Sequence, residues 1–492
     1  MSKNPLKQLA GETVVYGMSS ILARFINFVF VPIYTRVLST SEYGLATEVL
    51  AYIAILQVVF TLGLETGCFR YANKHDRPHE VFSNALMTVG ILSVILLLGL
   101  SLGSDQISRL MGYNGFRNVI IYVGAILAID NFTAILFAKL RFLHKAFKFA
   151  LLKTIKILSE TAFNLILFFF VPSYLAKHPG SFLLEFISPT PDFSYIIFAI
   201  FMSCIVLLII MLPDILKIRL KLNGTLWKQM MLYSLPLMIA GLPGVLNDFI
   251  DRPMFRLFSP EGTVWSSELG VFQAGAKLAT LMMLFIQMFR FAAEPFFFSK
   301  GESEDVKKKQ YADVMEHFTA FSMLIFLGLM LYMGIIGLIL GKNFREGIDI
   351  VPIMVMAYVI LGMNFNVSMW YKLSGKTNYG ILITAAGLLV TLLLNIFLMP
   401  LYSYHAAAWG HLASYTVMML ISIRLGNKYY PIPYRWGKVF GFIVVGLIIY
   451  GISLILPPMN IILKYGIHTA LILLYILYYL KIEKISIWKL KL

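Results

Sequence analysis

Several ionisable side chains lie inside long apolar runs of this sequence. A charged side chain near the middle of a bilayer costs at least ~2.5–3.5 kcal/mol, so it normally faces a cavity or an opposite charge. The candidates here are Arg24, Lys277, Glu48, Asp130 and Glu160. The two cations have the chemistry to bind an anionic group. The three carboxylates have the chemistry to hold a cation, relay a proton or pair with a base.

The two cations lie deep in their apolar runs. At a helical rise of ~1.5 Å per residue, Arg24 and Lys277 each lie roughly at mid-membrane. We therefore predict that both line a cavity and bind an anionic substrate. The alternative for Arg24 is a structural ion pair with Glu48 or Asp130. Arg290 lies near the end of its run, and we expect it to snorkel to the inner membrane surface.

The carboxylates allow two interpretations. Burial raises the pKa of a carboxyl group unless a partner stabilises its charged form. Glu48, Asp130 and Glu160 are therefore candidates either for ion coupling or for ion pairs, and the sequence leaves both open. Lys156 and Lys153 lie one and two turns from Glu160, respectively. We expect both to snorkel to the inner surface.

A further charged stretch is GVLNDFIDRPMF, which contains Asp248, Asp251 and Arg252. This stretch follows a long apolar run, which we predict to begin a membrane helix at Met230. Asp248 lies ~27 Å along that helix, so we expect these charges near the outer boundary of the membrane. Asp248 and Arg252 have the i,i+4 spacing of a helical ion pair. Pro253 then weakens the helix. We predict an outer gate or an ion pair at the interface.

The elements that must position these residues are membrane helices. Of the 492 residues 59% are hydrophobic and 13% are charged, whereas soluble proteins average about 25% charged residues. We read the first apolar run as a retained membrane helix and not as a cleaved signal peptide. The apolar runs predict an all-α protein with 14 transmembrane helices: Thr13–Leu38, Gly44–Thr66, Val81–Gly103, Arg117–Ala138, Ala150–Val171, Phe193–Leu212, Met230–Phe258, Leu269–Phe289, Val314–Leu340, Ile350–Trp370, Tyr379–Met399, Ala406–Leu425, Val439–Leu456 and Asn460–Leu480.

The basic residues orient these helices. With a cytoplasmic N-terminus, 28 of the 41 Lys and Arg residues fall on the cytoplasmic side and nine on the other. This bias predicts that both termini are cytoplasmic. The net charge of +16 is therefore a topology signal, and nucleic-acid binding is not expected. Both faces have only short loops, which argues against an enzyme with its active site in a large external loop.

Motifs for other chemistry are missing. Cys68 and Cys204 make no disulfide framework. His75 and His79 have i,i+4 spacing but no third ligand, so no metal site is expected. No phosphate-binding glycine loop occurs, so ATP is not an obvious fuel. We expect no cofactor and no catalytic residue.

A weak internal repeat divides the chain. The helix pairs that start at Tyr16 and Tyr233 each contain a short loop ending in Glu-X-Gly, EYG at Glu42–Gly44 and ELG at Glu268–Gly270. Parallel repeats of this kind place a transporter's substrate site between two halves. We predict six-helix bundles over residues 1–229 and 230–425. Residues 426–492 add two helices and a basic cytoplasmic tail.

Five segments carry a resemblance to a known family: PIYTRVLSTSEYGLATEVLA, YSLPLMIAGLPGVLNDFIDRPMF, ELGVFQAGAKLA, FRFAAEPFFFSK and NIFLMPLYSYHAAAWGHLASY. The chain resembles the polysaccharide and oligosaccharide flippases (O-antigen flippase-like) of the MOP superfamily. That resemblance implies the MOP (MATE-like) transporter fold, with two bundles and alternating access. It also implies an undecaprenyl-diphosphate-linked oligosaccharide as cargo, moved to the outer leaflet of the bacterial inner membrane. Arg24 and Lys277 match the basic positions expected in helices one and eight.

The resemblance leaves related functions open. A lipid II flippase is the nearest alternative, although that group usually has more basic residues in helices one and two. A MATE-type antiporter would favour an acidic cavity, and a membrane glycan polymerase would need a large external loop. Coupling to H⁺ or Na⁺ is expected of the family. A polysaccharide polymerase and chain-length machinery are candidate partners.

Overall fold

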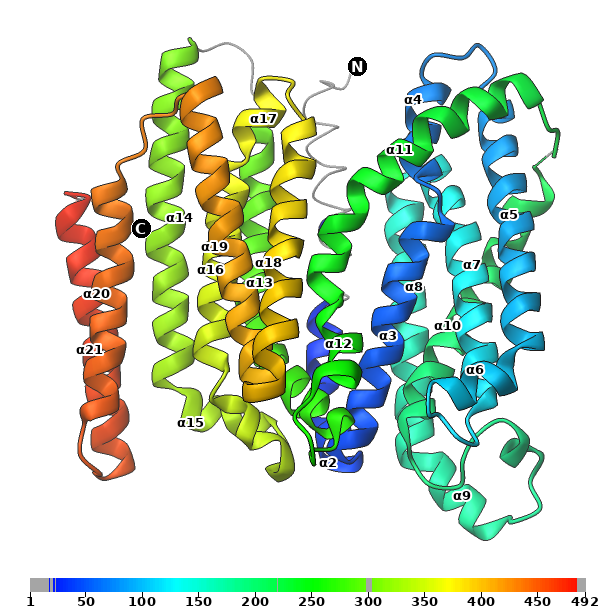
Figure 1. Ribbon diagram of the computed structural model, residues 1–492, viewed down its shortest axis with the longest axis horizontal. Coiled ribbons are helices and arrows are strands. Elements are labelled where there is room, and N and C mark those ends of the chain that lie inside the picture. Colours follow the sequence, from blue (N-terminus) through cyan, green and yellow to red (C-terminus); the bar gives the residue numbers. More distant parts are fainter. Residues whose placement is uncertain (1–16, 18–20, 23, 219, 298–302, 485–492) are drawn as a thin grey trace. The chain divides into compact units, whose positions relative to one another are not determined.

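The computed structural model describes residues 17, 21–22, 24–218, 220–297 and 303–484, and these residues form helices without any strand (Figure 1). Thirteen helices within this part are long and apolar enough to cross a membrane. They correspond to the second to fourteenth predicted helices. The first, Thr13–Leu38, includes residues outside the described part, so the count of fourteen stays a prediction. The all-α, multi-pass class is confirmed.

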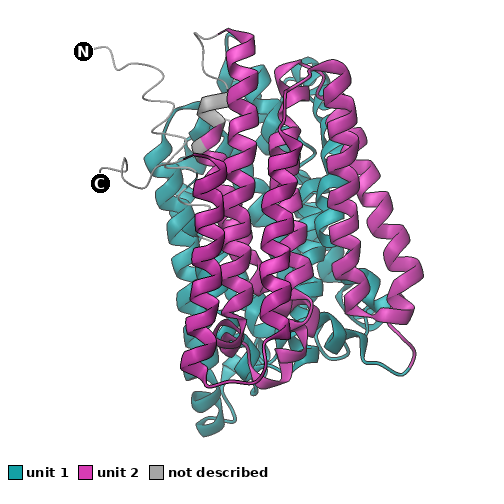
Figure 2. Cartoon of the chain, turned by 90° about the vertical axis from the view of Figure 1, so that its left-hand side faces the viewer, with its two compact units in different colours: residues 1–257, 262–270 teal, residues 258–261, 271–492 magenta. Residues whose placement is uncertain are grey.

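The chain forms two compact units, which Figure 2 distinguishes by colour. Unit 1 comprises residues 1–257 and 262–270. Its α-helices are α2 (Val31–Val37), α3 (Thr40–Phe60), α4 (Leu64–Ala72), α5 (Pro78–Leu102), α6 (Ser104–Leu110), α7 (Arg117–Phe142), α8 (Ala146–Leu165), α9 (Val171–Lys177), α10 (Phe193–Leu216), α11 (Gly224–Phe249), most of α12 (Asp251–Phe258) and the start of α13 (Trp265–Phe297). A π-helical segment, Ile166–Phe170, joins α8 to α9, and a 3₁₀ helix, Phe182–Glu185, precedes α10.

Unit 2 comprises residues 258–261 and 271–492. After the remainder of α13 its α-helices are α14 (Glu304–Leu331), α15 (Met333–Ile336), α16 (Val351–Val367), α17 (Met369–Leu373), α18 (Asn378–Tyr402), α19 (Tyr404–Tyr429), α20 (Trp436–Ile455) and α21 (Ile461–Ile482). The 3₁₀ segments Gly337–Ile339 and Lys342–Ile348 precede α16. In this division into compact units α11 belongs to unit 1, whereas the internal repeat predicts a boundary between residues 229 and 230. The division by repeat stays a prediction.

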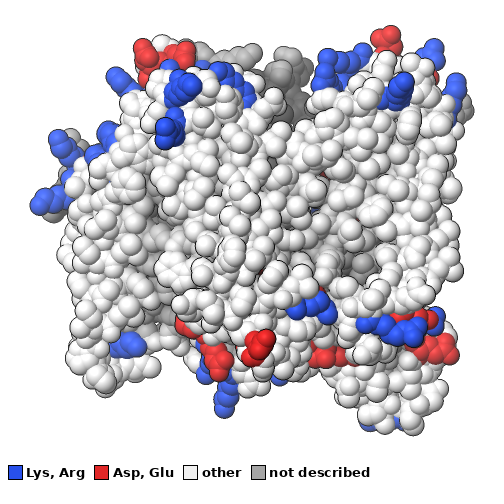
Figure 3. Space-filling model, in the orientation of Figure 1, with Lys and Arg blue, Asp and Glu red and all other residues white. Residues whose placement is uncertain are grey.

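The surface of the helices suits lipid. Apolar side chains of α5 at Ile91, Ile95, Leu98 and Leu102 recur on one face and are exposed. On the face shown in Figure 3, charged side chains gather near the ends of the helices, and the surface along the helix middles is almost entirely uncharged. Apolar exposure of this kind is stable in a bilayer and costly in water.

The two repeat-related glycines pack against each other where α3 and α13 begin. Ser39 caps α3 by accepting a hydrogen bond from the Glu42 backbone N–H at 3.1 Å. A Cβ atom at Gly44 would lie 1.8 Å from the carbonyl oxygen of Ser266. A Cβ at Gly270 would lie 1.9 Å from that of Thr40. The sequence motif therefore corresponds to a backbone contact that only glycine permits.

The second predicted helix, Gly44–Thr66, is wrong as a continuous element. The chain breaks between α3 and α4, where Leu62 and Gly63 have φ values of +53° and +66°. A Cβ at Gly63 would lie 2.5 Å from the Ser234 carbonyl oxygen on α11. The absence of a side chain at Gly63 thus allows both the turn and the close approach of α11.

The seventh predicted helix, Met230–Phe258, is also divided. α11 begins six residues earlier than predicted, because Asn223 caps it by accepting from the Leu226 N–H. It contains Pro236 and Pro243 and is bent in Figure 1. The break falls at Ile250, before Pro253, because proline is tolerated in the first turn of a helix, where its missing N–H would have no partner.

Candidate functional site

The two predicted substrate-binding cations belong to different units. Arg24 lies in unit 1, in the helical stretch of residues 24–29, and its side chain is exposed. Lys277 lies on α13 in unit 2 and is half-buried. Their role in binding a substrate stays a prediction. Their cooperation in one cavity stays a prediction.

Asp130 forms an ion pair with Lys156. The Lys156 Nζ lies 2.5 Å from the Asp130 Oδ1, and the two side chains are 17% and 16% exposed. The Cys204 thiol donates to the same Oδ1 at 3.5 Å. The expectation that Lys156 snorkels is therefore wrong, because a carboxylate lies within reach on α7. Lys153 instead places its Nζ 4.3 Å from the centre of the Phe137 ring, a cation–π contact.

Glu160 lies one turn beyond Lys156 on α8 and is half-buried. Its backbone carbonyl accepts a hydrogen bond from the Asn164 amide at 2.9 Å. The Tyr34 hydroxyl donates to the Asn164 side-chain oxygen, also at 2.9 Å. Glu160 thus adjoins a polar group that links α8 to α2. Its role in ion coupling stays a prediction.

Glu48 is fully buried in a cluster that the sequence did not predict. Arg256 of α12 donates to it through Nε at 2.8 Å and through Nη2 at 2.6 Å, so the ion pair is bidentate. The hydroxyl of Tyr113 donates to Glu48 Oε2 at 2.6 Å, and that of Tyr52 donates to Oε1 at 3.3 Å. The Arg256 guanidinium also lies over the Trp265 ring, 4.1 Å from its centre. The alternative pairing of Glu48 with Arg24 is therefore not what the structure shows.

The cluster around Glu48 fixes the protonation states of Arg256 and Tyr113, which lie outside the candidate membrane spans. Burial opposes the charged form of Arg256, but hydrogen bonding and attraction to Glu48 outweigh it and raise the pKa of the guanidinium. Burial and the negative charge of Glu48 raise the pKa of the Tyr113 phenol far above its ordinary value. Arg256 therefore stays charged and Tyr113 stays a hydrogen-bond donor throughout the physiological pH range.

The three predicted gate residues flank the break between α11 and α12. Asp248 is exposed on the last turn of α11, and Asp251 is buried at the first position of α12. Arg252 is half-buried, with its guanidinium 4.5 Å from the centre of the Phe249 ring. Asp248 and Arg252 therefore belong to two helical segments, and their pairing stays a prediction. Their role as a gate stays a prediction.

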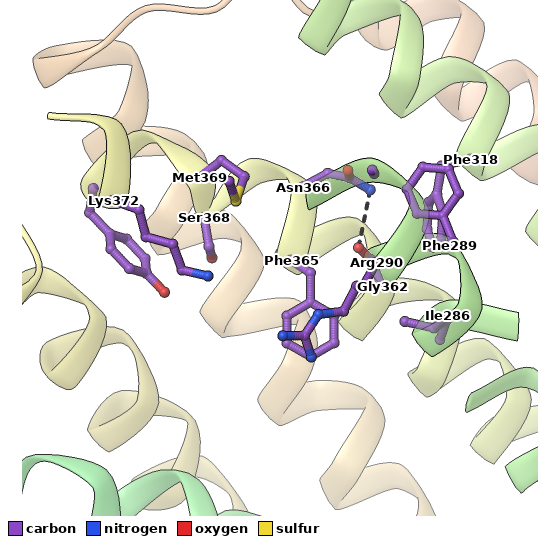
Figure 4. A pocket seen from close by; sticks show the side chains of 12 residues that line it. Ile286, Phe289, Arg290, Phe318, Gly362, Phe365, Asn366, Ser368, Met369 and Lys372 are labelled. Carbon is purple, nitrogen blue, oxygen red and sulfur yellow. Dashed lines mark hydrogen bonds between the residues drawn. The ribbon is translucent and has the colours of Figure 1, made fainter. Parts of the chain in front are cut away.

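Unit 2 contains a narrow basic pocket that the sequence also missed. It has a volume of about 40 Å³ and lies where α13, α14, α16 and α17 approach one another (Figure 4). Arg290 and Lys372 supply its cations, and Tyr371, Ser368 and Asn366 supply its polar groups. Its volume suits one small oxyanion group.

Aromatic packing holds Arg290 in this pocket. Its guanidinium lies 4.2 Å from the centre of the Phe365 ring, as Figure 4 shows. The Asn366 amide donates to the Gly362 carbonyl at 3.3 Å, which fixes the wall beside it. Arg290 is exposed and its guanidinium lies over a ring, and its snorkelling to the inner surface stays a prediction. Sequence reasoning could not join Arg290 to Lys372, because they lie on helices α13 and α17.

Comparison with known proteins identifies the family and the fold. The model of a family described as "Polysaccharide biosynthesis protein" matches residues 9–300. A search of curated protein sequences found no match.

Three solved structures illustrate the fold. The lipid II flippase MurJ, in an inward closed conformation, has a TM-score of 0.72 at 11% identity and covers 95% of this chain and 99% of its own. An outward-facing multidrug resistance MATE family transporter of the MOP superfamily has a TM-score of 0.60 at 12% identity, covering 90% and 99%. A MOP superfamily transporter from Pyrococcus furiosus, described as having a binding pocket of reversed polarity, has a TM-score of 0.57 at 14% identity, covering 86% and 94%.

These neighbours confirm the MOP-type membrane fold inferred from the resemblance. The family model spans more than half of the sequence, from before the first predicted helix to just beyond the end of α13. The chain belongs to the polysaccharide biosynthesis protein family.

Proposed function

We propose that this protein is a flippase for an undecaprenyl-diphosphate-linked oligosaccharide, such as an O-antigen, capsule or exopolysaccharide repeat unit. It moves this cargo from the inner to the outer leaflet of the bacterial cytoplasmic membrane by alternating access. The observation that carries the proposal is the family match over residues 9–300, on a chain with the fold of known flippases and transporters. The protein is not an enzyme in this proposal.

The cations support an anionic cargo. A diphosphate is recognised best by Arg and Lys, whose hydrogen bonds to phosphate oxygens are charge-assisted. Arg24 and Lys277 are the proposed deep contacts. The small pocket of Arg290 and Lys372 would receive a phosphate oxygen group on the cytoplasmic side, the side on which the basic residues predict both termini.

Ion coupling and partners complete the proposal. Asp130 and Glu160 are the proposed coupling carboxylates, because protonation of Asp130 would break its bond to Lys156 inside the membrane. Glu48 is the weakest of the three candidates, because Arg256 already binds both of its oxygens. The gate residues Asp248, Asp251 and Arg252 would control access from the outside. A polymerase and chain-length machinery would receive the flipped cargo.

A lipid II flippase is the second candidate, and the similarity to MurJ favours it. Both cargoes carry the diphosphate-linked lipid, so a cationic site alone does not distinguish them. They differ in the cellular consequence of loss. Loss of a lipid II flippase stops the supply of precursor for the cell wall, whereas loss of an oligosaccharide flippase stops the supply of repeat units for a surface glycan.

The test is a deletion strain of the source bacterium. We expect lipid-linked oligosaccharide to accumulate in the inner leaflet, and we expect a plasmid copy of the wild type to clear it. Arg24→Ala and Lys277→Ala should each reduce clearance by about tenfold or more, the effect of losing one charge-assisted contact. Lys177→Ala, an exposed cation on α9, is the matched control and should clear normally.

Two outcomes would contradict the proposal. Accumulation of lipid II, with normal surface glycan, would assign the second candidate. Normal clearance by both Arg24→Ala and Lys277→Ala would refute the cationic site. Normal expression of each variant in the membrane must be confirmed by immunoblot.

A further inference from the structure

Unit 1 encloses a second cavity, and its chemistry differs from that of the basic pocket. It has a volume of about 340 Å³, which lies within the range of small-molecule sites. Its walls come from the turn between α6 and α7, the first turns of α7, and the segment between the 3₁₀ helix Phe182–Glu185 and α10. In the orientation of Figure 1 this segment follows α9 at the lower edge.

The walls of the cavity combine amides, hydroxyls and aromatic rings. The residues that matter are Asn114, Asn118, Tyr122, Phe116 and Phe186. None of the described residues that line the cavity is charged. This composition offers no cationic side chain to a phosphate. It also excludes a purely apolar slot for a lipid chain.

Hydrogen bonds preorganise the cavity. The Asn118 amide donates to the Glu185 carbonyl at 2.9 Å, and the Tyr122 hydroxyl donates to the Phe186 carbonyl at 2.8 Å. These bonds tie the connecting segment to α7. An amide has two N–H donors and a carbonyl acceptor, so Asn118 retains capacity for a ligand, as does the acceptor side of Tyr122. Gly115, with φ of +85°, forms the turn that carries Asn114 to the rim.

One lining ring, that of Phe186, packs against a second exposed ring. The Phe186 and Phe182 side chains are 40% and 68% exposed, and their ring centres lie 5.0 Å apart. A pyranose ring presents hydroxyls around its edge and C–H groups on its faces. Amides and hydroxyls satisfy the former, and aromatic rings pack against the latter.

We propose that this cavity binds a neutral saccharide unit of the glycan. This inference rests on the proposed function, in which the connecting segment faces the outside and the glycan emerges there. The site would hold the sugar portion of the cargo after the transporter has reoriented to face the outside. Its residues are separate in sequence from those proposed to bind the diphosphate. A preformed site on the exit side would favour release of the glycan outward.

The test measures saccharide binding by the full chain in detergent, by saturation-transfer difference NMR. The probe is the oligosaccharide released by mild acid from the lipid-linked glycans of the source bacterium. We expect transfer to the sugar protons with the wild type. Asn114→Ala and Phe186→Ala should each weaken binding by about fivefold, the effect of losing roughly one hydrogen bond or one ring contact.

Thr190→Ala is the matched control, because Thr190 is exposed on the same segment but does not line the cavity. It should bind as the wild type does. Competition by inorganic pyrophosphate would indicate a phosphate site and overturn the inference. Equal binding by the wild type and Asn114→Ala would also overturn it, as would the absence of binding by the wild type.

The two proposals fail separately. If the wild type binds no oligosaccharide but still clears the accumulated lipid-linked glycan, the cavity inference fails and the proposed function stands. If the wild type moves no lipid-linked glycan in the deletion strain, the proposed function fails.

Discussion

At the scale of single residues, buried charges are explained by their partners. Glu48 has no exposed surface and would be costly alone, but Arg256 binds both of its oxygens and Tyr113 supplies a third hydrogen bond. Asp130 is similarly matched by Lys156. Two of the three carboxylates proposed for ion coupling from their depth thus form ion pairs. A carboxylate already paired inside the protein responds to a cation only if the pair breaks.

The pair of Glu48 and Arg256 makes a direct prediction. Glu48→Gln should lower the free energy of unfolding by about 1–3 kcal/mol, because it leaves a guanidinium that is only 21% exposed without its counter-charge. Thermal unfolding in detergent measures the effect. Glu65→Gln is the matched control, since the side chains of Arg141 and Glu65 are 34% and 44% exposed and their pair should contribute less than about 1 kcal/mol.

A double substitution separates charge from packing. Glu48→Gln combined with Arg256→Met removes both charges and should recover part of the lost stability. An unfolding temperature for Glu48→Gln equal to that of Glu65→Gln would show that the buried pair contributes no more than the exposed one.

At the scale of elements, small residues and ion pairs decide how the helices meet. Gly44 and Gly270 let the first turns of α3 and α13 touch through their backbones, with a hydroxyl contact of 2.7 Å between Thr40 and Ser267 beside them. In unit 2 a different device holds α20 and α21 to α14. Arg435 binds the buried Glu316, and Lys438 bridges Glu316 and Glu483 at 3.2 and 3.0 Å.

The glycine contact predicts a steric effect. Gly44→Ala should destabilise the protein by about 1–3 kcal/mol, because its Cβ would overlap a backbone oxygen that has no flexible side chain to move. Gly99→Ala on α5 is the control, since nothing lies within 4 Å of its added Cβ. That substitution should be neutral or stabilise the helix by up to about 1 kcal/mol. Thermal unfolding of the two variants measures the difference, and equal midpoints would refute the close contact.

At the scale of the whole molecule, the charge distribution predicts the topology. The basic excess lies on one side of the predicted spans, and a chain with fourteen crossings returns to the side on which it began. On the face shown in Figure 3, apolar helix surfaces and charged helix ends fit a multi-pass membrane protein, and the orientation stays a prediction. The family match and the MOP-type fold are properties of this whole, and no single residue carries them.

Reporter fusions test the topology. Green fluorescent protein fused after Leu492 should fluoresce and alkaline phosphatase at the same place should be inactive, because the C-terminus is predicted to be cytoplasmic. Phosphatase inserted after Gly180, in the segment between α9 and α10, should be active. Phosphatase activity at the C-terminus would mean an odd number of crossings or the opposite orientation.

The sequence by itself determined the class, the thirteen described spans and the family resemblance. Each of these depends on local composition: an apolar run of ~20 residues must become a membrane helix, because unpaired backbone groups are too costly in lipid. The predicted helices were wrong at Gly63 and Ile250, where the structure breaks a helix within an apolar run. Hydropathy does not mark such breaks. Ser39 and Asn223 show that capping residues could have marked some helix starts.

Only the tertiary structure decided which charges meet. Glu48 pairs with Arg256, which is 208 residues away in sequence, and Asp130 pairs with Lys156, which is 26 residues away. Arg290 and Lys372 line the same pocket. The neutral cavity near Asn118 likewise joins two segments that are remote in sequence. Depth along a helix gives the cost of burying a charge, but the partner that offsets this cost depends on helix rotation and packing. Those depend on contacts between distant segments, which one sequence does not reveal.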